Sequence, residues 1–193
     1  MKTKLPILLA IIMTVGWAAT VSAEEGRRGA LFQIGAGTAV PFYPSETEAA
    51  FSFIESGVGV ERIKIGLNLA LGFGISQNGI LMARIDGMGD RLYDVSDYFQ
   101  LNMYLYSLGY RFYPSATGFY LESGVGMATC VMQSSSLGQS TSDPGFGYGA
   151  GCGYDFNHDI NGFSFTIEAK YNSYTFEGDS AGGISLVGNL CWK

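Results

Sequence analysis

The stretch that decides the fold is RIKIGLNLALGFGI, residues 62–75. Every odd position from Ile63 to Ile75 is apolar, whereas the even positions from Arg62 to Gly74 are basic, polar or small. Alternation with a period of two is typical of a β-strand with one apolar and one polar face. Soluble strands are usually about five or six residues long, and a tilted strand needs about 9–11 residues to cross a bilayer. The stretch therefore predicts a membrane-spanning β-strand.

Similar alternating segments follow one another along the chain. Clusters of Gly, Pro, Asn, Asp and Ser, which are typical of turns, separate them. The segments predict strands at 29–40, 58–75, 79–90, 98–113, 118–132, 145–156, 162–175 and 183–192. A single-chain bacterial barrel closes with an even number of antiparallel strands, and this count is even. The predicted fold class is all-β, an eight-stranded antiparallel up-and-down transmembrane β-barrel.

The connections between these strands fall into two groups. Three are short, at 76–78, 114–117 and 157–161. They alternate along the chain with longer, polar connections at 41–57, 91–97 and 133–144, and the last connection, 176–182, is intermediate in length. Membrane barrels have short periplasmic turns and longer extracellular loops. The longer connections are therefore predicted to lie outside the cell.

Residues 1–23 have the pattern of a secretory signal peptide. Lys2 and Lys4 precede an apolar stretch that runs to Trp17, and Val21-Ser22-Ala23 forms a small-residue cleavage site. We expect cleavage after Ala23, export through the inner membrane and a barrel domain at 24–193. Loss of Lys2 and Lys4 leaves 9 of the 11 basic residues against 17 acidic ones, a formal charge of 9 − 17 = −8. This acidity argues against nucleic acid as a partner.

The inward faces of the predicted strands carry charged residues of both signs. An eight-stranded barrel is just wide enough for side chains to fill it, so enclosed charges must pair. We interpret them as a structural polar core, and a narrow gated ion path is the alternative. The predicted lumen charge network consists of Arg62, Lys64, Arg84, Asp86, Glu122, Asp155, Glu168 and Lys170.

The segment 98–113 changes its apolar face part of the way along. Apolar residues up to Leu105 share the face of Phe99, and beyond it the apolar pattern passes to the face of Tyr106 and Phe112. A β-bulge adds one residue and shifts the face. The sequence therefore predicts a bulge near Ser107.

Residues that could carry catalysis or bind a metal are few. His158 is the only histidine and falls, beside Asp159, in a turn predicted to face the periplasm, so a catalytic base at the outer surface is missing. We expect neither enzymatic activity nor a cofactor. The acidic group Asp86, Asp90, Asp94 and Asp97 lacks the spacing of a calcium loop. Three cysteines without a CxxC pair predict packed thiols: Cys130, Cys152 and Cys191.

Three segments resemble small outer-membrane β-barrel proteins of the OmpA/OmpX type. They are LGYRFYP (108–114), GFYLESGVGM (118–127) and ISLVGNLCW (184–192). The resemblance covers the whole mature chain and implies residence in the bacterial outer membrane. It also implies a closing aromatic residue that the barrel-assembly machinery recognises. Trp192 matches this assembly signal, and Lys193 after it departs from the pattern. The family includes structural proteins, adhesins, narrow pores and a few lipid-modifying enzymes, so it does not decide the function.

The sequence favours a structural or adhesive surface protein that acts through its outer loops. We expect the first long connection, with Phe42, Tyr43, Glu46, Glu48 and Glu55, to be the contact surface for a host or surface ligand. Outer-membrane lipid and the assembly machinery are the other expected partners. A narrow or gated channel is one alternative. A soluble periplasmic barrel is another, and it would turn its apolar faces inward around a ligand.

Overall fold

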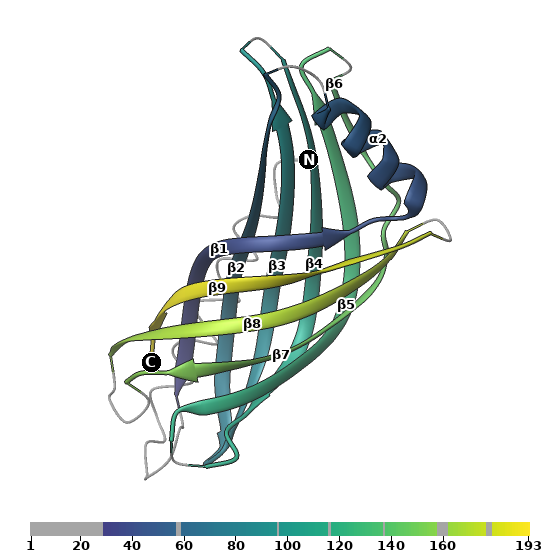
Figure 1. Ribbon diagram of the computed structural model, residues 1–193. Helices are drawn as coiled ribbons and strands as arrows, with labels where there is room; N and C mark the ends of the chain where they lie inside the picture. Colours follow the sequence, from purple (N-terminus) through teal and green to yellow (C-terminus); the bar gives the residue numbers. More distant parts are fainter. Residues whose placement is uncertain are drawn as a thin grey trace, which may run out of the picture.

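The protein is an antiparallel β-barrel, as a computed structural model of it shows (Figure 1). The structure describes residues 29–56, 59–95, 97–115, 117–136, 138–157, 162–176 and 179–193. The predicted signal peptide, 1–23, and His158 and Asp159 lie outside these ranges. Eight long strands form the wall: β1 (Ala30–Phe42), β2 (Glu61–Ser76), β3 (Gly79–Tyr93), β4 (Tyr98–Phe112), β5 (Phe119–Ser134), β7 (Gly145–Asp155), β8 (Phe163–Phe176) and β9 (Asp179–Trp192).

Each long strand pairs with its neighbours in the chain, and β1 pairs with β9, which closes the barrel. The predicted eight-stranded antiparallel barrel is thereby confirmed, with strand ends that differ from the predicted ones by up to four residues. The turns that join β2 to β3, β4 to β5 and β7 to β8 lie at one end. We call this end the inner end, and the opposite end, with the longer connections, the outer end.

Two further elements at the outer end were not predicted (Figure 1). The short strand β6 (Gly138–Thr141) extends the hairpin at the end of β5. The helix α2 (Ser45–Glu55) occupies the first long connection. Its alanines are strong helix formers, and Glu46 and Glu48 in its first turn interact favourably with the helix dipole.

The bulge predicted near Ser107 is wrong. The pairing of β4 with β3 and with β5 runs through this region residue by residue, without a shift of register. Met103 and Leu105 are buried inside the barrel on the same face as Ser107, while Tyr106 and Leu108 point outward. The face does not change, because the outer part of the lumen is itself lined with apolar side chains.

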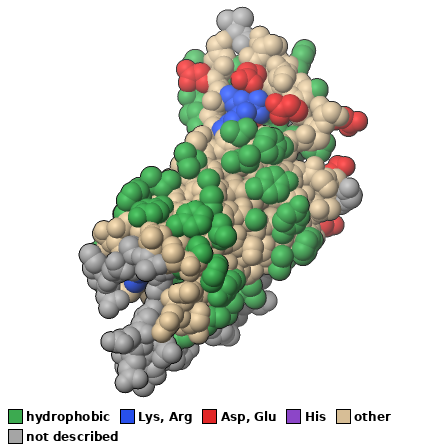
Figure 2. All heavy atoms as spheres, turned by 60° about the horizontal axis from the view of Figure 1, so that its bottom comes forward, with side chains coloured by type: hydrophobic (Ala, Val, Ile, Leu, Met, Phe, Trp, Pro, Cys, Tyr) green, Lys and Arg blue, Asp and Glu red, His purple; other side chains and the backbone are tan. Residues whose placement is uncertain are grey.

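The outward surface of the wall is apolar. Seven side chains of β2, from Ile63 to Ile75, are each between 38% and 56% exposed, and hydrophobic side chains cover the middle of the molecule in Figure 2. A soluble barrel with a ligand inside would bury these side chains, so that alternative is not supported. No helix among the described residues is long and apolar enough to span a membrane.

Glycines on the inward face bring some neighbouring strands into close contact. At Gly126 of β5, a Cβ atom would lie 1.9 Å from the backbone oxygen of Tyr106 and 2.7 Å from Cα of Ser107, both on β4. Such an approach is open to glycine alone. The sheet therefore coils tightly here, and the lumen that it encloses is narrow.

Candidate functional site

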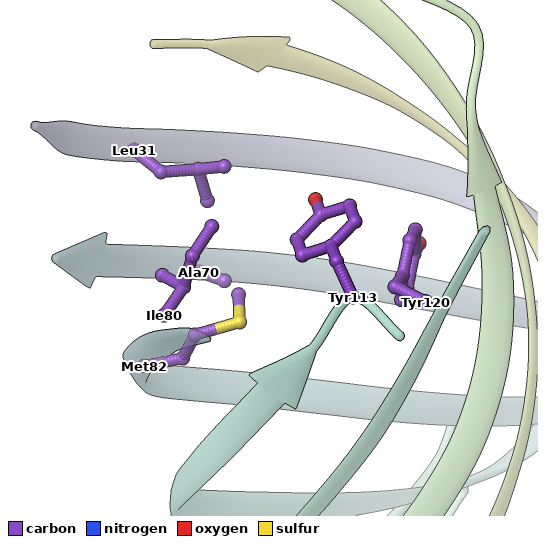
Figure 3. Close-up of a cluster of buried hydrophobic side chains, with 6 residues drawn as sticks. All are labelled: Leu31, Ala70, Ile80, Met82, Tyr113 and Tyr120. Carbon is purple, nitrogen blue, oxygen red and sulfur yellow. The ribbon is translucent and has the colours of Figure 1, made fainter. Parts of the chain in front are cut away.

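The inner end of the lumen is closed by an apolar cluster. Tyr113 and Tyr120 pack with their rings 5.5 Å apart, and the cluster is completed by Leu31, Ala70, Ile80 and Met82 (Figure 3). The Tyr113 hydroxyl donates to Asp155, which also forms an ion pair with Lys193. The inner end of the lumen is thus filled by apolar side chains, with Asp155 paired beside them.

Above this cluster, six buried charged residues form a network with equal numbers of both signs. The bases are Arg84, Arg111 and Lys170, and the acids are Asp86, Glu122 and Glu168. If all six are ionised, their charges sum to zero. Balance of this kind is what burial of charge requires, because an unpaired ion in a low-dielectric interior is costly.

Arg111 and Lys170 contact different oxygens of the same two carboxylates. Arg111 Nη2 lies 2.9 Å from Glu122 and 3.1 Å from Glu168, and its guanidinium stacks 3.9 Å above the Tyr120 ring. Lys170 Nζ lies 2.7 Å from Glu122 and 2.9 Å from Glu168. Arg84 also pairs with both glutamates, so each carboxylate contacts three bases.

Arg84 and Asp86 complete the network on β3. Arg84 Nη2 lies 2.8 Å from Glu168 and 3.2 Å from Asp86, and Arg84 also pairs with Glu122. Asp86 accepts a further hydrogen bond from Asn68 at 2.7 Å. A cavity of about 10 Å³ beside Arg84 has room for one water molecule. The middle of the lumen is thus packed with paired side chains.

A second apolar cluster covers the network toward the outer end. It consists of Ala39, Met88, Met103, Leu105, Ala128 and Tyr174. Tyr43, Cys130, Phe176 and Ala181 pack against it from the mouth of the barrel. The network is therefore enclosed between two apolar layers.

Arg62 stands at the mouth and ties α2 to the barrel wall. It donates to both carboxylate oxygens of Asp90, at 2.9 and 2.7 Å, and pairs with Glu55 of α2 at 2.9 Å. Its guanidinium also lies 4.7 Å from the Phe51 ring, and Glu48 of α2 is 3.6 Å away. One side chain thus holds two acids and an aromatic ring of the helix against β3.

Aromatic rings complete this attachment. Phe51 is the one buried residue of α2, and its ring stacks on Tyr43 at 5.2 Å and meets Phe99 of β4 edge-on at 5.4 Å. The Tyr43 hydroxyl donates to Asp90 at 3.2 Å. Burial, together with the negative charge of Asp90, raises the pKa of Tyr43 above its ordinary value, so the hydroxyl stays protonated.

The structure separates the predicted network into three groups. Arg84, Asp86, Glu122, Glu168 and Lys170 lie together in the centre. Arg62 lies at the mouth and Asp155 at the inner end. Lys64 is on the inward face of β2, in register with Asp90, and forms no ion pair among the described residues.

The prediction missed Arg111, which is fully buried and contacts both central glutamates. Arg111 shares the parity of Ser107, and an unbroken period of two along β4 places it inside. The predicted bulge would also have turned Tyr110 and Phe112 outward and Arg111 inward, so the signal was present under either interpretation.

The exposed charges of the outer end are mostly acidic. Among the described residues there, Arg91 is the only exposed base, and Figure 2 shows acidic side chains gathered at the upper end of the molecule. We call the exposed acids the acidic rim: Glu46, Glu55, Glu61, Asp94, Asp97, Asp143 and Asp179. The outer end therefore presents a negative surface.

Metal and thiol chemistry find little support in the described part of the chain. No group of three or more potential ligands is close enough there to hold a metal ion. Asp86 and Asp90, which belong to the acidic group noted in the sequence, are engaged by Lys170 and Arg62. The three cysteines are free: Cys191 is buried, Cys130 is half-buried, and Cys152 is exposed, contrary to the expectation of packing.

Comparisons with known proteins agree with this architecture. A family model described as "Outer membrane protein beta-barrel domain" matches residues 7–187. The attachment invasion locus protein Ail of Yersinia pestis, solved with the heparin analogue sucrose octasulfate, is similar in structure, with a TM-score of 0.57, 16% identity, and coverage of 84% of this chain and 97% of Ail. Neisserial surface protein A has a TM-score of 0.52 and 17% identity, with coverage of 88% and 99%. No curated protein sequence matches the chain.

Proposed function

Because the chain belongs to the family of outer-membrane β-barrel proteins, we propose that it is a surface protein whose filled barrel holds α2 and the outer loops for contact with a partner outside the cell. The protein resides in the bacterial outer membrane. The observation that carries the proposal is the lumen, in which a neutral charge network is enclosed between two apolar clusters. Because the lumen of such a barrel is filled, a partner would be bound at its outer end.

A narrow channel, the main alternative, is disfavoured by the same observation. An ion that crosses would have to pass both apolar clusters and displace buried ion pairs. Removal of one partner from a buried pair costs about 3–5 kcal/mol, because an uncompensated charge remains. The wall and the lumen thus serve to hold a rigid platform.

Two contacts of the barrel itself belong to the proposal. The apolar outward face fits the hydrocarbon of outer-membrane lipid. Trp192 ends the last strand at the inner end, is 53% exposed and meets Phe163 edge-on with ring centroids 4.7 Å apart. An accessible aromatic residue there is what the barrel-assembly machinery would recognise as its signal.

Replacement of Ser45–Glu55 by a flexible Gly-Ser linker of equal length tests the proposed function. Cells of a non-adherent Gram-negative host that produce the intact protein should bind to cultured epithelial cells above the level of an empty vector. In the linker variant, binding above the empty-vector level should fall at least tenfold, because the ordered contact surface is gone while the barrel remains. Counts of bound cells measure the effect.

Folding and exposure must be checked in the same cells. The linker variant should still shift its gel mobility on boiling, as a folded barrel does. A matched control replaces Ser136–Gly138, in another outer connection, by Gly-Ser residues and should keep adhesion. Adhesion that is absent from the intact protein, or unchanged in the linker variant, would refute the proposed function.

A further inference from the structure

The helix α2 has a second face that points away from the barrel. Glu46, Ala49, Ala50 and Phe53 follow the spacing i, i+3, i+4 and i+7, which places them on one side of a helix. All four are exposed, and Phe53 is 80% exposed, whereas Phe51 on the opposite side is 2% exposed. Alanines beside an aromatic ring allow a partner to approach the helix closely. The Phe53 ring therefore projects beyond the small side chains of Ala49 and Ala50.

This face is held in a fixed position. Phe51 packs between Tyr43 and Phe99, and Arg62 joins Glu55 of the helix to Asp90 of the barrel wall. A binding segment that is already ordered loses less conformational entropy when a partner docks. An exposed Phe53 contributes little to folding, since its ring stays in water, yet it can contribute to binding when a partner covers it.

Charge around the face indicates which partner fits. Glu46 lies on the outer face itself, and Glu55, which also pairs with Arg62, lies at the end of the helix. The rest of the acidic rim lies at the same end of the barrel. Sulfated glycans and anionic lipids would be repelled by this surface. A second copy of the chain would bring the same acidic face against itself. A basic surface is attracted to it and is steered toward it at low salt.

We propose that the outer face of α2 is a docking site for a basic polypeptide, which takes the Phe53 ring into an apolar pocket between Lys or Arg side chains. This inference rests on the proposed function and names the class of partner. The geometry divides the contact into two parts. Phe53 supplies the apolar anchor, and the acidic rim supplies attraction and orientation.

Selection from a random peptide library tests the docking site directly. The full barrel domain in phosphatidylcholine nanodiscs is panned with a phage library of random 12-residue peptides, after removal of phage that bind empty nanodiscs. Enriched peptides should carry several Lys or Arg residues and at least one large apolar residue. The leading peptide, synthesised and measured by calorimetry, should bind the Phe53→Ser variant at least tenfold more weakly.

Matched controls make the result specific to α2. Val95→Ser removes another fully exposed apolar residue of the outer end and should leave affinity unchanged. At 1 M salt, surface charges are screened beyond about 3 Å. The affinity of the peptide should therefore be much lower at 1 M salt than at low salt. Neutral or acidic peptides, equal affinity for the Phe53→Ser variant, or a library that yields no binder would overturn the proposal. So would Phe53-dependent binding of heparin or Phe53-dependent dimerisation.

The two proposals can fail separately. If adhesion is lost with the Gly-Ser linker but kept in the Phe53→Ser variant, the surface function stands and the docking site is wrong. If the intact protein confers no adhesion, the surface function itself is wrong.

Discussion

Replacement of Gly126 by alanine is expected to prevent assembly of the barrel. The added Cβ atom would lie 1.9 Å from the Tyr106 backbone oxygen and 2.7 Å from Cα of Ser107. Gly126 pairs with Ser107 on β4 and with Gly147 on β7, so the clash falls inside the β4–β5 ladder of the barrel wall. Backbone atoms cannot rotate away as a side chain does. We expect the overpacking to lower the free energy of unfolding by about 3 kcal/mol or more.

The measurement is the fraction of protein that shifts its gel mobility on boiling after refolding into detergent micelles. Gly87→Ala is the matched control, because the Cβ atom there would meet the side-chain ring of Tyr104 at 3.3 Å. That ring can move by a few tenths of an ångström. We expect the control to fold normally and the Gly126 variant to give little folded protein. Equal yields would show that β4 and β5 are not as close as described.

Replacement of Arg111 by methionine is expected to lower the free energy of unfolding by about 3–5 kcal/mol. Methionine preserves much of the side-chain length but removes the charge. Glu122 and Glu168 would then lose one of the bases that neutralise them, and Gln33 would lose the donor at 2.9 Å. The variant leaves an excess negative charge in a site that is fully buried.

Urea unfolding of the mature protein in lipid vesicles measures this loss, with the fluorescence of Trp192 as the probe. Arg91→Met is the matched control, since Arg91 is exposed at the outer end and stacks on Tyr98 at 4.7 Å. Its effect should stay within about 1 kcal/mol. Addition of Glu122→Gln to the Arg111 variant should restore part of the stability, because charge balance returns. A loss no larger than the control's would contradict the account of the network.

The strands could be predicted from the sequence because each one carries its own evidence. From Ile63 to Ile75 every outward position of β2 is apolar, and this pattern does not depend on the rest of the molecule. The helix α2 could not be predicted in the same way. The apolar residues of α2 are only weakly segregated to one face of the helix. The helix is held by Phe51 and Arg62, whose partners Phe99 and Asp90 are distant in the sequence from α2.

For the candidate site, the sequence predicts the inward face but not the contacts. The period of two tells which residues face inward, but the contacts between them depend on the height of each residue along the barrel. Arg62 and Lys64 share a face, yet only Arg62 reaches an acidic partner among the described residues. Arg111 could have been predicted, since Tyr110 and Phe112 on either side of it are apolar and point outward with or without the bulge. Apolar layers inside a polar lumen leave no separate signal in the sequence.

Ion conductance in planar lipid bilayers distinguishes a filled barrel from a pore, since the proposed function requires a lumen that side chains close from end to end. Purified protein, inserted under conditions in which a known porin gives stepwise currents, should give none across ±100 mV. Reproducible channel events from the wild type would contradict the account. They would be decisive if they changed size in the Arg111→Met variant, because the current would then pass through the buried network.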